Sequence, residues 1–447
     1  MSHDTFPISR LETDITPFID RRLRLLAEME AEGGGALLIP TAREQVRSRD
    51  SHYPFRFDSD FYYLTGFTEP DAWLLLRTHG EPRSILFCRA RDSAREKWDG
   101  LRLGPERAKE VLALDAAFPL SALEEQLVEL IDGAPILWAP LFEAEATDAV
   151  LRRLKTALAS KSRQGVVPPE RWHDARALIA RHRRIKSPWE IERMRQSAAI
   201  AAAAHRAAMV AARPGLSEGV LEGILLATFR QGGAEGPSYP PIVAGGANAC
   251  ILHYTENRAA IPEGSLVLID AGCEYRGYAS DITRTFPVNG RFSSAQRVLY
   301  ELVLSAQEAA IAATYPGAPF DAPHEAAIRT LVRGLVDLGL LRGSVDELIA
   351  AKDYLRFYPH RTSHWLGLDV HDVGTYRDGN DPVQLAPGMV LTIEPGLYIE
   401  PADDIPPDFC GIGIRIEDDA LVTDTGVELL TRDVPVAIDA IEELMKR

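Results

Sequence analysis

The most constraining stretch of this 447-residue chain is LVLIDAGCEYRGYASDITRT, at positions 266–285. Its beginning, residues 266–269, is an apolar run that predicts a buried strand, and Asp270 stands at the end of that run. Asp281 lies inside a second strand-like run at 280–286. The stretch therefore predicts two neighbouring strands with one aspartate on each.

Gly272 and Gly277 stand between the two runs, where a hairpin turn needs glycine. A hairpin here brings the two aspartates side by side, and two carboxylates pressed together in a half-buried site repel each other. A shared proton or a metal cation removes that repulsion. The other interpretation is a pair of solvated aspartates that flank a turn, because Asp is mostly exposed and favours turns.

Length and composition set limits on the class of protein. A chain of 447 residues predicts two or three domains, and 46% hydrophobic with 26% charged residues is the composition of a globular protein. A net charge of −16 argues against non-specific binding to nucleic acid or to an anionic membrane. The N-terminus has no apolar core of a secretory signal, and no apolar run reaches the about 18 residues of a membrane span. We therefore expect a soluble, cytoplasmic protein.

The four cysteines are scattered along the chain without CxxC spacing: Cys88, Cys250, Cys273 and Cys410. In a chain of this size, scattered cysteines are typical of buried thiols. We therefore expect neither disulfides nor a zinc site built from them.

The first part of the chain alternates short apolar runs with helix-like stretches. Strands are expected at 36–39, 73–76, 85–88 and 136–138, and helices between 11 and 29 and over 120–131. This alternation predicts an α/β domain over residues 1–180. The aromatic stretch at 59–67 is expected to form a core strand and a turn.

A domain boundary is expected near residue 180. A basic cluster, ArgHisArgArg at 181–184, precedes a helix start in which Ser187 can serve as N-cap. Pro188 then occupies the first helical position, and Glu190 completes a capping box. We interpret the basic cluster as a solvated linker and not as a binding patch.

The second part, residues 181–447, begins with long helices and ends in strands and turns. Helices are expected over 187–212, 218–231, 294–315 and 323–340, and closing strands over 389–393, 398–399 and 413–417. This order fits helix pairs packed on one face of a curved antiparallel sheet, which is an α+β domain.

Three further residues join the two aspartates. They are His364, Glu394, which ends an apolar strand, and Glu417. In the run 412–417, isoleucines alternate with Gly, Arg and Glu, so one face is apolar and the other presents Arg415 and Glu417 together. Each acid alone can be read as a strand-end turn residue. Four such acids are harder to explain in this way, because burying an unpaired carboxylate costs free energy and a shared cation removes that cost.

Four carboxylates and one imidazole can hold two divalent ions, with bridging carboxylates between them. An oxygen-rich set with a single nitrogen favours manganese, with cobalt, iron or zinc as alternatives, and disfavours magnesium. A water that bridges two such ions would be ionised near neutral pH and would act as a nucleophile.

Five motifs in the second part resemble, in order, those of Xaa-Pro aminopeptidase (aminopeptidase P), one of the pita-bread metallopeptidases that also include prolidase, methionine aminopeptidase and creatinase. The motifs are CILHYTEN (250–257), LIDAG with DITRTFP (268–287), SHWLGLDVHDVG (363–374), TIEPGLY (392–398) and GIRIED (413–418). DFYYLTGF at 60–67 extends the resemblance into the first part.

The resemblance implies a fold and a metal site. The fold is an α/β N-terminal domain, serving oligomerisation and substrate access, followed by an α+β pita-bread catalytic domain. Two Mn²⁺ ions per subunit would be held by Asp270, Asp281, His364, Glu394 and Glu417. Asp281 and Glu417 would bridge the ions. Glu394 would also take a proton from the nucleophilic water and pass it to the leaving proline nitrogen.

The resemblance also implies substrate contacts. His253 and His371 would line the substrate site and stabilise the tetrahedral intermediate, and His360 and Tyr398 would contact substrate. Without the resemblance, His253 can equally be interpreted as a half-buried histidine whose hydrogen bonds are satisfied. His371 can equally be interpreted as one half of a surface pair with its neighbour Asp372.

Three more residues are assigned by resemblance. Arg415 would contact substrate and support the ligands, and Tyr239 is a second candidate for that support. Arg415 can also be read as one half of a solvent pair with the acids at 418–419. Trp98 resembles an aromatic that reaches a neighbouring subunit's site in tetrameric relatives, and its alternative is a packing role.

One position departs from the family pattern. The family usually has glycine after the first histidine of the His-x-x-x-His stretch, and this chain has Arg361 there. Two consequences are expected: a backbone angle that glycine adopts more easily, or an inward charge that lowers metal affinity or holds a substrate carboxylate. If the charge of Arg361 acts on the site in this way, changing Arg361 to glycine alters dipeptide affinity.

The expected function is an aminopeptidase that removes the first residue from peptides with proline at the second position. The nearest alternative is an Xaa-Pro dipeptidase (prolidase) on the same fold and ligands. A catalytically inactive pita-bread binding protein and a creatinase-like hydrolase are weaker alternatives, because all five ligand positions carry ligating residues. A homo-oligomer, dimer or tetramer, is expected.

Overall fold

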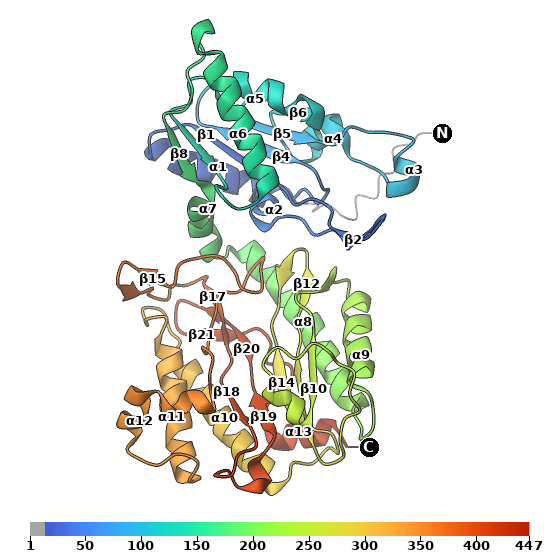
Figure 1. Ribbon diagram of the computed structural model, residues 1–447, viewed down its shortest axis with the longest axis vertical. Coiled ribbons are helices and arrows are strands. Elements are labelled where there is room, and N and C mark those ends of the chain that lie inside the picture. Colours follow the sequence, from blue (N-terminus) through green and yellow to red (C-terminus); the bar gives the residue numbers. More distant parts are fainter. Residues whose placement is uncertain (1–13, 447) are drawn as a thin grey trace. The chain divides into compact units, whose positions relative to one another are not determined.

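The computed structural model describes residues 14–446, and the chain divides into two compact units, Met1–Arg183 and Arg184–Arg447 (Figure 1). The division falls inside the basic cluster at 181–184. No helix in the described part of the chain is long and apolar enough to cross a membrane.

The first unit is built on a six-stranded mixed sheet of order β6-β5-β4-β1-β7-β8. β1 pairs antiparallel with β4 and parallel with β7. The strands are β1 (Ala36–Pro40), β4 (Trp73–Arg77), β5 (Ser84–Cys88), β6 (Ala116–Pro119), β7 (Ile136–Ala139) and β8 (Arg171–Asp174). Each predicted strand of this part is present, extended by one residue at one end.

Helices cover this sheet because its central strands, β1, β4 and β5, are mostly apolar and buried on both faces. α5 and α6 place Leu127 and Leu154 against Leu38, Leu75 and Phe87 of the sheet in one buried cluster (Figure 1). The helices are α1 (Thr16–Ala31), α2 (Ser59–Thr65), α3 (Glu96–Asp99), α4 (Gly104–Val111), α5 (Leu123–Ile131), α6 (Glu145–Ser160) and α7 (Ala175–Arg184). A separate small hairpin joins β2 (Val46–Ser48) to β3 (Ser51–His52). The expected α/β organisation is confirmed.

The predicted strand at 59–67 is wrong, because this segment forms helix α2. The Asp58 side chain accepts a hydrogen bond from the Phe61 backbone N–H at 2.8 Å, and Gly66 ends the helix in the left-handed conformation. The aromatic residues are buried as expected. Local capping at both ends therefore outweighed the β propensity of the aromatics.

The second unit places strands between two helix pairs, α8 with α9 and α10 with α11 (Figure 1). Its helices are α8 (Pro188–Ala211), α9 (Glu218–Gln231), α10 (Ser294–Ala312), α11 (Ala322–Asp337), α12 (Val345–Ala351) and α13 (Ile438–Leu444). The predicted capping box is present, since Ser187 accepts from the Glu190 N–H and Glu190 accepts from the Ser187 N–H. α10 and α11 each end three residues before the predicted bound, at Ala312 and Asp337.

Short antiparallel sheets make up the strand layer. They are ordered β10-β11-β14, β13-β12-β9, β17-β20-β21, β18-β19 and β15-β16. The strands are β9 (Gly236–Pro237), β10 (Ile242–Gly245), β11 (Leu266–Asp270), β12 (Cys273–Tyr275), β13 (Tyr278–Ala279), β14 (Thr283–Pro287), β15 (Arg377–Asp378), β16 (Asp381–Pro382), β17 (Val390–Ile393), β18 (Gly396–Ile399), β19 (Ile412–Arg415), β20 (Asp418–Val422) and β21 (Val427–Leu429). This is the expected α+β arrangement.

The two strands of the aspartate hairpin pair as predicted, with Asp270 of β11 opposite Thr283 of β14. The second strand, however, begins at Thr283 and not at position 280, and a smaller hairpin, β12–β13, is inserted between the strands. Gly277 provides the positive φ of that inner turn. Gly272 serves a different purpose, because a Cβ there would lie 1.6 Å from the Ser280 carbonyl oxygen.

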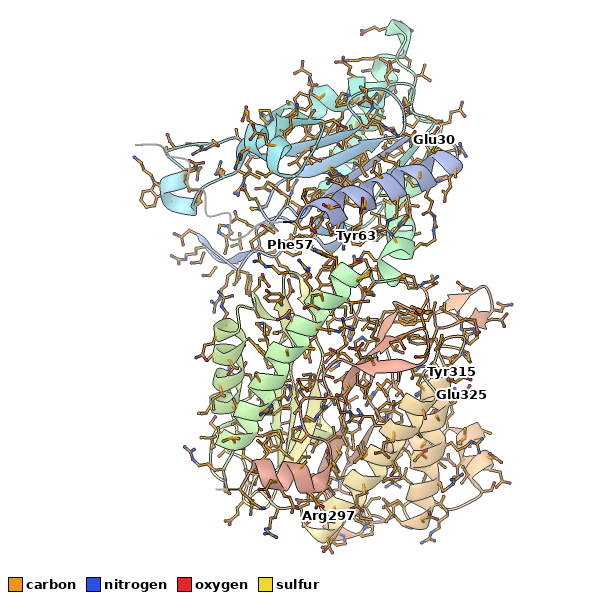
Figure 2. All side chains as sticks on the ribbon, turned by 180° about the vertical axis from the view of Figure 1, so that it is seen from behind. Glu30, Phe57, Tyr63, Arg297, Tyr315 and Glu325 are labelled. Atoms are coloured by element: carbon orange, nitrogen blue, oxygen red, sulfur yellow. The ribbon has the colours of Figure 1, made fainter. Side chains whose placement is uncertain are left out.

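The last helix, α13, contacts α8 and forms an ion pair with α10. The Nη2 atom of Arg297 on α10 lies 3.0 Å from Oε1 of Glu442 on α13 (Figure 2). All four cysteines are free thiols. Cys88 and Cys273 are buried as predicted, whereas Cys250 and Cys410 are only half-buried, so the prediction of buried thiols is wrong for that pair.

Candidate metal centre

The five predicted ligands converge on one cavity of about 920 Å³ in the second unit. Asp270 ends β11, Asp281 precedes β14, Glu394 follows β17, and Glu417 follows β19. His364 comes from the loop before Trp365, which bridges to Leu391 of β17. All five side chains line the cavity: Asp270, Asp281, His364, Glu394 and Glu417.

Backbone hydrogen bonds bring these strand ends together. The Glu417 N–H donates to the Thr283 carbonyl at 3.1 Å, next to the aspartate hairpin. The Glu394 N–H donates to the Thr362 carbonyl at 2.8 Å, next to the histidine loop. The acids therefore meet because each one stands beside an end of a strand, and backbone hydrogen bonds link these strand ends.

The ligand atoms are close enough to share a cation. Asp281, His364 and Glu417 each offer one atom, and these atoms all lie within 4.8 Å of one another. The His364 Nε2 atom lies 3.4 Å from Asp281 Oδ2 and 3.6 Å from Glu394 Oε1. Asp281, His364 and Glu417 are three of the five residues that the resemblance implies as ligands.

Neighbouring polar side chains hold the acids in place. The Tyr239 hydroxyl donates to Asp270 Oδ1 at 2.6 Å and also contacts Asp281. Arg415 donates from Nη2 to Asp270 Oδ2 at 2.5 Å and from Nη1 to the Tyr398 hydroxyl at 2.9 Å. Both residues that the sequence suggested as supports thus contact the acids directly.

Burial governs the protonation of the carboxylates. It raises the pKa of Glu417 well above its usual value and raises the pKa of Glu394 to about 7, and neighbouring carboxylates act in the same direction. Burial is also the largest cause of the raised pKa of Asp270, which the Arg415 charge partly offsets. Negative charge is therefore costly at this end of the cavity.

His364 provides the compensating charge for Asp281. Burial alone would lower the pKa of His364, but the Asp281 hydrogen bond and the Glu394 carboxylate outweigh it and raise that pKa to about 9. Burial would raise the pKa of Asp281, and the His364 hydrogen bond and charge lower it below its usual value instead.

The donor set fits divalent cations. Glu417 is 2% exposed and Asp281 5% exposed, so their carboxylates need a positive partner in place of water. Carboxylate oxygens with one imidazole nitrogen are the donors that such cations take. The side chains present therefore match the chemistry of a divalent-metal site.

Three predicted substrate histidines, His253, His360 and His371, line the same cavity, whereas Tyr398 is not among its lining residues. The His371 ring lies 4.4 Å from the His364 ring, and His253 lines the cavity with it. The His360 Nε2 atom lies 2.8 Å from the Tyr398 hydroxyl, and its Nδ1 atom lies 3.6 Å from Glu394 Oε2.

Two of the alternative interpretations are wrong. Arg415 is 4% exposed and pairs with Asp270, so it does not form a solvent pair with the acids at 418–419. Asp372 does not form a surface pair with His371, because it is buried and lies 3.0 Å from the Lys186 Nζ atom.

The side chains of Trp98 and Arg361 are both exposed. Trp98 belongs to the first unit, where its side chain is 87% exposed, which contradicts a packing role. Arg361 is not among the non-glycine residues with positive φ in the described part of the chain, so the expected backbone requirement is wrong. Its side chain lines the cavity and contacts Asp321.

Sequence reasoning missed several polar residues beneath the acids. The Thr283 hydroxyl donates to Glu417 Oε2 at 2.6 Å, and Asp419 Oδ2 accepts from the Asp281 N–H at 3.1 Å. Thr392 Oγ1 accepts from the His364 N–H at 3.1 Å. The available signal was a polar residue in a strand that is buried throughout, most plainly Thr392 in the otherwise apolar β17.

Comparison with known proteins agrees with this geometry. Residues 192–424 match metallopeptidase family M24, and residues 18–138 match the aminopeptidase P N-terminal domain. The Xaa-Pro aminopeptidase of Escherichia coli is 46% identical over 96% of this chain and 97% of its own length.

Solved structures give the same result. Pseudomonas aeruginosa aminopeptidase PepP is 47% identical, with a TM-score of 0.95 over 97% of this chain and 98% of that one. A zinc-substituted E. coli aminopeptidase P in complex with product is 45% identical, with a TM-score of 0.93 over 97% of this chain and 98% of that chain.

The fold and these matches define a metallopeptidase of family M24, to which the chain belongs. Within the family it is a member of the Xaa-Pro aminopeptidases (aminopeptidase P), and it is an enzyme. The expected fold, an α/β domain followed by a pita-bread domain, is confirmed. The alternatives of an inactive binding protein and a creatinase-like hydrolase are set aside.

Proposed function

We propose that this enzyme hydrolyses the bond between an N-terminal residue and a following proline in peptides. The observation that carries the proposal is the meeting of four carboxylates and His364 in one cavity, beside His253, His360 and His371. Relatives that match nearly the whole chain are named Xaa-Pro aminopeptidase.

The proposed ligands are Asp270, Asp281, His364, Glu394 and Glu417, with Asp281 and Glu417 shared between two ions. Two Mn²⁺ ions held there would supply an ionised water as the nucleophile and would polarise the scissile carbonyl. Co²⁺, Fe²⁺ or Zn²⁺ suit the same donors.

The protein's own groups supply the proton transfer. Glu394 takes the proton that the water loses when it is ionised and passes it to the proline nitrogen as the peptide bond breaks. His360, 3.6 Å from Glu394, lies where the leaving proline is released.

Further groups position the substrate. His253 and His371 face the reacting carbonyl and stabilise the developing oxyanion. Proline carries no N–H in a peptide, so the site needs no acceptor for one. The first unit serves oligomerisation and substrate access in a cytoplasmic dimer or tetramer, where Trp98 contributes to a neighbouring subunit's site.

The test is hydrolysis after chelation and manganese add-back, on Ala-Pro-Ala, Ala-Pro and Ala-Ala-Ala. Metal-dependent release of alanine from Ala-Pro-Ala, with Ala-Ala-Ala spared, is the expected result. Cleavage of Ala-Pro alone would replace the proposal with an Xaa-Pro dipeptidase. Absence of cleavage of every peptide, with metal bound, would contradict it.

A further inference from the structure

The outer part of the cavity carries two arginines that the proposed chemistry does not use. Arg361 and Arg377 both line the cavity, and the side chain of each is 59% exposed. Asp321, just before α11, lies between them. These three residues are called the cationic rim below.

The rim has more positive charge than its own acid neutralises. Arg361 Nη2 contacts Asp321 Oδ1, whereas Arg377 Nη2 lies 3.9 Å from Asp321 Oδ2. The single negative charge of Asp321 thus lies close to two positively charged guanidinium groups. Arg377 is oriented by its own hairpin, because its Nη1 atom donates to the Asn380 carbonyl at 2.5 Å. The acids of that hairpin, Asp378 and Asp381, do not line the cavity.

The rim lies next to the leaving side of the site. Arg361 directly follows His360, whose Nδ1 atom lies 3.6 Å from Glu394 Oε2. In the proposed function Glu394 protonates the proline nitrogen, so the leaving peptide begins at Glu394. A peptide chain that continues from this proline past His360 would reach Arg361, the next residue in the sequence.

The rim is also bordered by an aromatic wall. Phe320 and Tyr376 are the sequence neighbours of Asp321 and Arg377, and their ring centroids are 4.8 Å apart. Both rings line the cavity. Aromatic surface beside two guanidinium groups suits a peptide residue that has an apolar body and an anionic group.

We propose that Arg361 and Arg377 recognise a carboxylate on the residue that follows proline in the substrate. This assignment rests on the proposed function. The carboxylate has two sources, the chain end of a tripeptide or an acidic side chain in a longer peptide. Guanidinium groups suit both, because their planar donors match the two carboxylate oxygens.

The test compares Ala-Pro-Ala, Ala-Pro-Ala-amide and Ala-Pro-Glu-amide with the manganese-loaded enzyme. Arg361→Gln and Arg377→Gln are each expected to raise KM for Ala-Pro-Ala by about 5- to 10-fold while kcat changes by less than about twofold. Asp321→Asn removes the competing acid and lowers that KM. Arg329→Gln, which breaks an exposed pair with Asp346, is the matched control and leaves KM unchanged.

The amides separate the two sources. Recognition of the chain end is supported if the arginine variants alter the KM for Ala-Pro-Ala and leave the KM for Ala-Pro-Ala-amide unchanged. An altered KM for Ala-Pro-Glu-amide supports recognition of an acidic side chain. Added salt reduces either preference because the rim is exposed.

Two results overturn the assignment. Equal effects of the variants on all three peptides, or no effect on any, show that the rim does not recognise a carboxylate, and the proposed function then still stands. Absence of alanine release from every peptide by the unsubstituted enzyme overturns the proposed function and this assignment with it.

Discussion

Arg415 and Asp270 form an ion pair at the base of the cavity, with Arg415 Nη2 2.5 Å from Asp270 Oδ2 and both side chains largely buried. Arg415 lies on β19 and Asp270 at the end of β11, and the Arg415 Nε atom also donates to Thr283 at 3.0 Å. One guanidinium group therefore fixes a proposed ligand and the threonine that supports another.

Replacing Arg415 with Gln is expected to weaken metal binding and lower kcat/KM. The loss should be about 10- to 100-fold, the usual effect of removing a group that orients a ligand. Metal titration followed by calorimetry, together with kinetics on Ala-Pro-Ala, checks both effects. Arg297→Gln, which breaks a partly exposed pair with Glu442, is the control. Unchanged metal affinity in the Arg415 variant would contradict this role.

Replacing Glu394 with Gln is expected to lower kcat by about 10²- to 10⁴-fold, because glutamine cannot carry the proton to the proline nitrogen. KM should change much less, since peptide binding uses other groups. Steady-state kinetics with metal content measured on the same samples separates proton transfer from metal loss. A variant that keeps its metal and its kcat would show that another group carries the proton.

Replacing Glu218 with Gln is expected to destabilise the segment that carries His253. Glu218 is fully buried, and Oε2 accepts from the Tyr254 hydroxyl at 2.9 Å and from the Ala259 N–H at 2.8 Å. Glutamine turns an acceptor into a donor there, which should cost about 1–3 kcal/mol of unfolding free energy.

Urea unfolding of the Glu218 variant, with exposed Glu308→Gln on α10 as control, measures this cost. The activity of the folded variant gives a second readout, because a displaced His253 should lower kcat/KM. Equal stability of the two variants would exclude Glu218 as the anchor of this segment.

The stability of the protein should fall in mild acid because of His205. His205 is fully buried, its Nε2 atom lies 2.8 Å from the Ala271 carbonyl oxygen, and its Nδ1 atom has no hydrogen-bond partner among the residues that the structure describes. Burial lowers the pKa of His205 from 6.5 to about 4. The unfolded chain therefore binds a proton at a higher pH than the folded protein does.

This contribution to stability is complete above pH 6.5 and is lost as pH falls toward 4, to a total of about 3 kcal/mol. Urea unfolding in chelator at several pH values measures it, and His205→Asn should flatten this part of the profile. His52→Asn, at an exposed histidine, is the control. Identical profiles for the two variants would contradict the assignment to His205.

Local patterns predicted much of the fold and of the candidate site. The capping box at Ser187 and the strand that ends in Asp270 were predicted because caps and apolar runs act within a few residues. The strand predicted at 59–67 was wrong because the caps at Asp58 and Gly66 determine that helix, and the aromatic composition hid them.

The sequence by itself determined which residue types stand at the strand ends: Asp270 and Glu394 each follow an apolar run, and Glu417 follows a run in which isoleucines alternate with other residues. Only the tertiary structure decided their partners. The pairing of Arg415 with Asp270 and the contact of Arg361 with Asp321 join residues far apart in the chain. The first contact joins strands of two different sheets and the second joins a loop to the start of α11, so both depend on how separate elements pack together, which no local pattern in the sequence encodes.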